Sequence, residues 1–289
     1  MGALSAAILI ELERRGTETS RKWSKAYMKD STPFFGCSMP VVRECVRAVV
    51  DRGTTGAASK KRARGVNALG FSADSTVGDV LLKSYVDDAI ELLRHDHGEA
   101  KHAGTVLLCE HEPPLLLATS ETLERLEREV MRAETVFTDW AVTDGFATRV
   151  LTRVWKTNSS LAERILSYAY ETDASVWHRR CGVVAFANVF KPNVDASMLP
   201  ANFGIAVVNA CEANVLAAPN ERFAQTASAW VLRYALAADE RAHLGVRERA
   251  VDVVCKHKSV WTTEAKKSLV EQLNKRADAS LKARILALK

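Results

Sequence analysis

Hydrophobic residues recur at helical spacing along nearly the whole chain, and few stretches alternate between apolar and polar residues for long. This pattern predicts an all-α protein in which most helices bury one face and expose the other. We expect helices at about residues 3–15, 18–30, 39–52, 75–94, 98–111, 121–133, 136–156, 159–171, 174–191, 200–217, 221–238, 241–257 and 263–287.

The connections between these helices are short after residue 75, and prolines separate several of them. One longer irregular stretch is expected from Arg52 to Asp74. No change in composition divides the chain, so we expect a single domain over residues 1–289. Briefly connected amphipathic helices of this length indicate either a compact bundle or a solenoid of antiparallel HEAT- or ARM-like helix pairs.

A weak internal repeat favours the solenoid. Two expected helices carry the motif W-x-x-R, as Trp177 with Arg180 and as Trp230 with Arg233, and Trp140 begins a related helix. The tryptophans are 37 and then 53 residues apart, which is near the period of HEAT-type repeats if the second interval holds an insertion. In a solenoid these equivalent helices lie side by side and line one concave surface.

The stretch FTDWAVTDGFATRVL places a carboxylate on an otherwise apolar helix face. At 100° per residue, Asp144 shares a narrow arc with Trp140 and Leu151. Two interpretations fit this position. Asp144 is either a buried cap or salt-bridge partner of an arginine, or a functional carboxylate that stabilises positive charge or holds a water molecule.

The tryptophans and arginines also allow two interpretations. Indoles in repeat helices commonly belong to the core, and an arginine three residues away commonly extends to solvent. On a shared surface, however, guanidiniums bind phosphates and indoles stack on sugars, bases or cations. Together with Asp144 they suit a ligand that is anionic along its backbone and cationic at its reacting centre.

The net charge of +5 is compatible with a polyanionic partner and equally with an ordinary protein. Basic residues concentrate in KKRAR, Lys60–Arg64, and in the expected C-terminal helical tail over residues 263–289. Both are either solvated surfaces or phosphate contacts. In a eukaryotic source KKRAR would also serve as a nuclear-import signal.

Six scattered cysteines without a C-x-x-C pair indicate reduced residues of an intracellular protein. The N-terminal run LSAAILI is too short for a membrane span and lacks a preceding basic region, so no membrane association is expected. The expected location is the cytoplasm or nucleoid in a prokaryote, with the nucleus as an alternative in a eukaryote.

A histidine-rich region forms a second cluster of chemically active side chains. H-x-H and its neighbours resemble metal ligands by type, but their spacings match no established metal site, so no metal is expected. The cluster comprises His95, His97, His102 and His111 with Asp96, Glu99 and Cys109.

Four segments of the chain resemble the AlkD-like DNA alkylation repair glycosylases in order and spacing. They are YMKDSTPFFGCSMPVVRECV from Tyr27, TDWAVTDGF around Trp140, VWHRRC around Trp177 and QTASAWVLRYA around Trp230. The resemblance spans about residues 23–238. It implies a right-handed superhelical solenoid of HEAT-like pairs whose concave face binds duplex DNA.

The resemblance implies hydrolysis of the N-glycosidic bond of N3- and N7-alkylated purines, such as 3-methyladenine and 7-methylguanine, without base flipping. The product is an abasic site, the protein acts as a monomer, and no cofactor is expected. The resemblance assigns Asp144, Trp140, Trp230 and Arg180 as catalytic residues, and Tyr27, Lys29, Trp177, Arg179 and Arg233 as DNA-binding residues.

The chain departs from the family pattern at two positions. Ala141 stands where relatives often carry a second acidic residue, and Asp139 stands where they often carry a second aromatic one. The matched active-site segments hold no lysine for a Schiff base, so strand cleavage is not expected. The alternatives are a non-catalytic binder of damaged or branched DNA and, more distantly, a protein-interaction scaffold.

Overall fold

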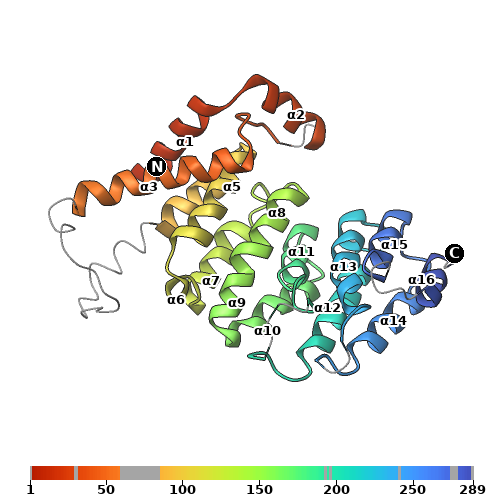
Figure 1. The fold of residues 1–289 in the computed structure, drawn as a ribbon. Helices are drawn as coiled ribbons and strands as arrows, with labels where there is room; N and C mark the ends of the chain where they lie inside the picture. The colour runs from red at the N-terminus through yellow and green to blue at the C-terminus, as the bar shows by residue number, and fades with distance from the viewer. Residues whose placement is uncertain are drawn as a thin grey trace. The chain divides into compact units, whose positions relative to one another are not determined.

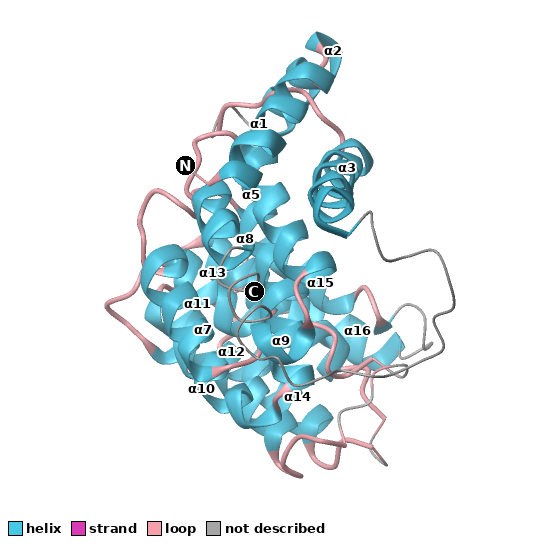
Figure 2. Ribbon diagram, turned by 90° about the vertical axis from the view of Figure 1, so that its left-hand side faces the viewer, coloured by secondary structure: helices cyan, strands magenta, loops and turns pink. Residues whose placement is uncertain are grey.

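The structure is a computed structural model that describes residues 2–28, 32–58, 85–191, 194, 197–239, 242–273 and 279–287. Within these ranges every regular element is a helix and none is a strand (Figures 1 and 2). The helices pack in neighbouring pairs, as in an all-α helical-repeat solenoid, which confirms the predicted fold class. The right-handed twist and the concave DNA-binding face stay predictions.

The helices follow one another closely in the described ranges. In order they are α1 (Ala3–Arg15), α2 (Glu18–Met28), α3 (Met39–Ala58), a helix over residues 85–93, α5 (Gly98–Val106), η1 (Leu107–His111), α6 (Pro114–Leu117), α7 (Ser120–Leu126), η2 (Glu127–Met131), α8 (Trp140–Phe146), η3 (Ala147–Leu151), α9 (Thr152–Thr157), η4 (Ser159–Leu161), α10 (Ala162–Ser167), η5 (Tyr168–Tyr170), α11 (Val176–Val184), α12 (Phe203–Ala217), α13 (Arg222–Ala235), α14 (Val246–Lys256), α15 (Thr263–Val270) and α16 (Ala279–Leu286).

The chain forms two compact units. Unit 1 comprises Met1–Leu117 and Glu121–Val142, and unit 2 comprises Ala118–Ser120 and Thr143–Lys289. That residues 1–289 act as one domain stays a prediction.

In unit 1, α1, α3 and α5 pack on one another. Their contact faces carry fully buried aliphatic side chains, among them Ile8 and Leu12 of α1 and Val42 of α3. The positions recur at helical spacing, so the amphipathic pattern of the sequence accounts for this packing. Glycine is needed at Gly36, where φ is 94° and an added Cβ would lie 2.2 Å from the Thr17 carbonyl oxygen.

Unit 2 is a two-layered stack of helices. In one layer α13 packs between α11 and α15, and in the other α12 contacts α10 and α14 (Figure 1). The two W-x-x-R helices, α11 and α13, are therefore direct neighbours, as the repeat predicted. The core of unit 2 includes the fully buried Trp155, Tyr168 and Phe186.

Two predicted helices around the candidate site have the wrong bounds. The helix predicted at 136–156 begins at Trp140, because the side chain of Asp139 accepts a hydrogen bond from the Val142 N–H and caps the helix there. The helix predicted at 174–191 ends at Val184. The next carbonyl, of Ala185, accepts hydrogen bonds from Thr152 Oγ1 and Trp155 Nε1 instead of continuing a helix.

The bounds of two further predicted helices also differ from those of the structure. The single helix predicted at 263–287 is two helices, α15 and α16, which pack on each other. Leu269 and Leu273 are buried before the break and Ile285 is buried after it. The helix predicted at 39–52 continues to residue 58, while the Arg52–Asp74 stretch beyond it and residues 75–84 lie outside the described residues.

Candidate active site

Asp144 lies in the middle of α8, and its side chain is only 13% exposed. Its carboxylate is gripped by one guanidinium from α11. Arg180 Nε donates to Oδ1 at 2.6 Å, and Arg180 Nη2 donates to Oδ2 at 2.8 Å. This two-point contact fixes both the position and the plane of the carboxylate.

Arg180 is 5% exposed and is itself held from a third helix. Its remaining terminal nitrogen, Nη1, donates to the Phe223 carbonyl oxygen at 2.7 Å and to Thr226 Oγ1 at 3.3 Å, both on α13. Arg180 therefore links Asp144 to α13. Removing a charge pair from water costs free energy unless its groups are hydrogen-bonded, and these four contacts offset that cost.

The helix that carries Asp144 changes its winding immediately afterwards. The α-helical turns of α8 end at Phe146, and the π-helical turn η3 follows before α9. Thr148 Oγ1 donates to the Asp144 carbonyl oxygen at 2.6 Å, which supplies a local hydrogen bond next to this change. Such π-helical turns inside α-helices are frequent at functional sites, where they re-aim side chains.

The start of α8 explains one of the two departures from the family pattern. Asp139 is 4% exposed, and its Oδ1 accepts a hydrogen bond from the Val142 N–H at 2.9 Å, while Thr32 Oγ1 donates to its Oδ2 at 3.2 Å. Asp139 is thus the N-cap of the helix that carries Asp144. The other departure, Ala141, lines a cavity in unit 1.

Trp140, the first residue of α8, belongs to a set of three aromatic rings in unit 1. The ring of Tyr27 meets it edge-on at 5.7 Å between centroids, and Trp23 stacks on Tyr27 at 5.0 Å with an interplanar angle of 8°. Tyr27 is 53% exposed and Trp23 is 66% exposed. Sequence reasoning named Tyr27 and Trp140 but missed Trp23, although its i, i+4 spacing to Tyr27 was a usable signal.

The two tryptophans of the W-x-x-R helices lie in unit 2 and are both half-buried. Trp177 packs on Phe223 of α13 at 4.7 Å between ring centroids. The guanidinium carbon of Arg233 lies over Trp230, 5.8 Å from the centroid of the Trp230 ring. The structure therefore brings Asp144, Arg180, Trp177 and α13 into one connected set of contacts.

The other predicted DNA-binding arginines are already engaged. Arg233 is 16% exposed, forms an ion pair with Glu271 and donates to the Tyr234 hydroxyl at 3.3 Å. Arg179 is 5% exposed, and its guanidinium donates to the carbonyl oxygens of Thr172 and Ala174. Arg179 thus does not present its charge at the surface in this structure.

Several sequence-based candidates lie outside the described residues. These are Lys29, the KKRAR segment and, in the basic tail, Lys275, Arg276 and Lys289.

The histidine-rich region of unit 1 packs as a structural cluster. The ring of His97 stacks on Phe35 at 4.1 Å between centroids, and His95 lies 5.2 Å from His97. Burial lowers the pKa of His95 and of His111. Among the residues that the structure describes, no group of three His, Cys, Asp or Glu side chains is placed to hold a metal ion.

None of the six cysteines, all of which the structure describes, is in a disulfide, and Cys37, Cys45, Cys181 and Cys211 are buried. Cys181 directly follows Arg180. Its burial, with the nearby Asp144 carboxylate, raises the pKa of its thiol far above the ordinary value. In the described part of the chain, no helix combines the length and the apolar character that crossing a bilayer requires.

Comparison with known families places these observations in context. A family model described as DNA alkylation repair enzyme matches residues 73–245, which is more than half of the chain. The matched range includes α8, α11 and α13, the helices that carry Asp144, Arg180 and Trp230, whereas Tyr27 precedes it. The chain has no significant match among curated proteins. The matched range and the all-helical fold show that the chain belongs to the family of DNA alkylation repair enzymes, whose partner is DNA with alkylated bases.

Proposed function

We propose that the protein is a monofunctional alkylpurine DNA glycosylase of base excision repair. Its substrates are cationic N3- and N7-alkylated purines, such as 3-methyladenine and 7-methylguanine, in duplex DNA. It acts as a monomer without a cofactor and without base flipping, and it leaves an abasic site. The observation that carries the proposal is the Asp144 carboxylate, held in a fixed plane one helical turn from Trp140.

The chemistry requires little more than one well-placed carboxylate. An alkylated purine already carries a positive charge and leaves as a neutral base, so its departure needs no general acid. The barrier is then dominated by positive character at the deoxyribose carbon and by capture of that carbon by water. Asp144 supplies a negative charge for the first step and an acceptor for the water proton in the second.

The resemblance assigns Arg180 as a catalytic residue, and its contacts suggest how it acts. Its Nε and Nη2 hold Asp144, and its Nη1 holds α13. We assign Arg180 as a positioning residue that fixes the carboxylate. A carboxylate oxygen can accept more than one hydrogen bond, so the pair with Arg180 does not by itself prevent Asp144 from accepting a water proton.

The aromatic residues and Arg233 complete the proposal. Trp140, Trp230 and Trp177 offer indole surfaces to the sugar and backbone of the lesion, and exposed Tyr27 contacts DNA. Arg233 reaches a phosphate by exchanging its ion pair with Glu271. Lys29 and Arg179 complete the proposed DNA-binding set by the resemblance alone.

The deciding experiment measures base release from methylated duplex DNA in the presence of EDTA, with free 3-methyladenine and 7-methylguanine quantified by chromatography. We expect release by the wild type and an Asp144→Asn variant that binds the DNA but releases base at least about 100-fold more slowly. Binding without release by the wild type would instead identify a non-catalytic binder of damaged DNA. Unchanged release by the variant would remove Asp144 from the mechanism.

A further inference from the structure

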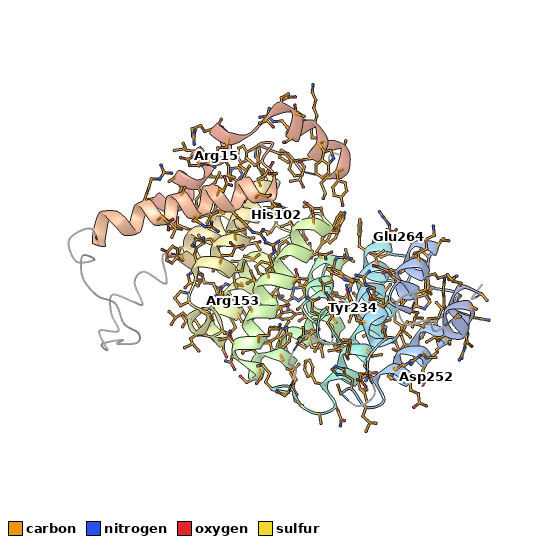
Figure 3. All side chains as sticks on the ribbon, viewed as in Figure 1. Arg15, His102, Arg153, Tyr234, Asp252 and Glu264 are labelled. Carbon is orange, nitrogen blue, oxygen red and sulfur yellow. The ribbon has the colours of Figure 1, made fainter. Side chains whose placement is uncertain are left out.

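Unit 1 contains a cavity of about 570 Å³ that the proposed catalytic step does not use. Helix α2 lines one side of it with Trp23 and Tyr27, and the 34–39 segment lines another. His102 of α5, labelled in Figure 3, and Ala141 of α8 also line it. Its volume is that of a pocket for a small organic molecule.

The wall formed by residues 34–37 is rigidly preformed. Glu99 accepts three backbone hydrogen bonds there, from the N–H groups of Phe35 at 2.9 Å, Gly36 at 2.8 Å and Cys37 at 3.0 Å. The ring of Phe34 lies so close to Gly98 that an added Cβ would be 2.6 Å from it. A pocket whose walls are fixed before binding loses less entropy when a ligand enters.

The chemistry of the walls selects a planar, uncharged or cationic ligand. Trp23 and Tyr27 are stacked on each other at i, i+4 and remain largely exposed, so they offer flat surfaces to a ring system. Met28 and Met39 adapt their shape to irregular ligands. The described residues that line the cavity include neither lysine nor arginine, so none of them provides a guanidinium or an ammonium for a phosphate.

The charged groups at the cavity also favour an uncharged or cationic ligand over an anionic one. Glu99 and Asp139 line it, and both are carboxylates. Lys101 lies near Asp139, and its ammonium is directed to the carbonyl oxygens of Thr135 and Val136. Lys101 therefore offsets Asp139 in part, while Glu99 leaves the surroundings acidic, which disfavours an anion and favours a ligand with N–H donors.

We infer that this cavity binds the free alkylated purine base that the reaction releases, stacked against Trp23 and Tyr27. The assignment rests on the proposed function for the identity of the ligand. A purine is planar, carries N–H donors for the hydroxyl groups of the lining, and has no phosphate once it is free. Burial and the Glu99 carboxylate raise the pKa of the lining Cys37 thiol to about 12, so this thiol stays neutral.

The test is a calorimetric titration of free 3-methyladenine into the full-length protein. We expect saturable binding by the wild type and, because stacking on one aromatic residue contributes about 1–3 kcal/mol, at least fivefold weaker binding by Trp23→Ala. Ala141→Phe should block binding by filling the cavity without removing the stacking rings. Tyr170→Ala, which removes an aromatic residue 49% exposed elsewhere, is the matched control and should bind normally.

Unmodified adenine should bind about fourfold more weakly than 3-methyladenine, because it lacks one methyl group to bury, at about 0.8 kcal/mol. The inference is overturned if the wild type shows no saturable binding. It is also overturned if Trp23→Ala and Ala141→Phe both bind 3-methyladenine as tightly as the wild type while keeping normal melting temperatures. Equal affinity for adenine overturns the assignment to an alkylated base. Asp144→Asn should keep this binding while losing base release, so failure of the proposed catalysis is distinguishable from failure of the pocket.

Discussion

The two units hold nearly buried carboxylates in different ways. In unit 1, Glu99 and Asp139 accept hydrogen bonds from backbone N–H groups, of Phe35, Gly36 and Cys37 in one case and of Val142 in the other. In unit 2, Asp144 is held by the guanidinium of Arg180. A carboxylate bound by backbone is part of the local fold, whereas one bound by a side chain can exchange partners when that side chain moves.

The same substitution at both kinds of site tests whether the two carboxylates differ in function. Asp139→Asn keeps an N-cap of similar quality, so we expect base release within about twofold of wild type. Asp144→Asn should lose at least about 100-fold in release and about 3 kcal/mol in stability, because Arg180 stays buried with half of its partner. Single-turnover release at 20 °C and chemical unfolding measure both quantities.

Equal losses of base release at the two positions would mean that Asp139, at the start of α8, matters as much for the reaction as Asp144 in the middle of the helix. In that case a carboxylate bound by backbone would contribute to catalysis, and the distinction between the two units would not hold.

The guanidinium of Arg180 holds both carboxylate oxygens of Asp144. Arg180→Lys keeps the positive charge but cannot contact both carboxylate oxygens in one plane, so we expect base release to fall about 10- to 100-fold. The loss should appear in the single-turnover rate and not in the dissociation constant for DNA. If affinity for DNA falls and the rate at saturating protein is unchanged, Arg180 binds phosphate and our assignment is wrong.

The smallest expected effect concerns an ion pair nearer the surface. Glu271→Gln removes the partner of Arg233 and should tighten binding to duplex DNA about two- to fivefold at low salt. Glu264→Gln is the matched control, because Glu264 of α15 pairs with Arg222 of α13, and Glu271 directly follows α15. Fluorescence anisotropy at several salt concentrations gives both affinities. Equal tightening by the two variants would reflect net charge alone.

The sequence predicted much of the fold because the helices are amphipathic. Residues 3–15 were predicted as a helix and α1 has these bounds. The errors lie where tertiary contacts end a helix, as at Ala185, whose carbonyl is taken by Thr152 and Trp155. No periodicity in the sequence carries that information.

The candidate site was predictable in part for the same reason. Helical geometry placed Asp144 beside Trp140 and allowed an arginine partner, and the structure identifies that partner as Arg180. Arg179 and Arg180 are adjacent in sequence and differ in direction by about 100°, so only the packing of α11 shows which one reaches Asp144. The role of Glu99 depends on a contact 62 to 64 residues away and had no local signal.

The thiol beside this site has a consequence for a protein that works where alkylating agents are present. The thiolate is the form of cysteine that attacks electrophiles. Cys181, completely buried next to Arg180, has a pKa raised by burial and by the Asp144 carboxylate, so it stays protonated at neutral pH. The same reagents that alkylate DNA therefore find almost no nucleophile at Cys181. Helix α11, whose Arg180 positions the Asp144 carboxylate, stays unmodified at this thiol while alkylating agents are present.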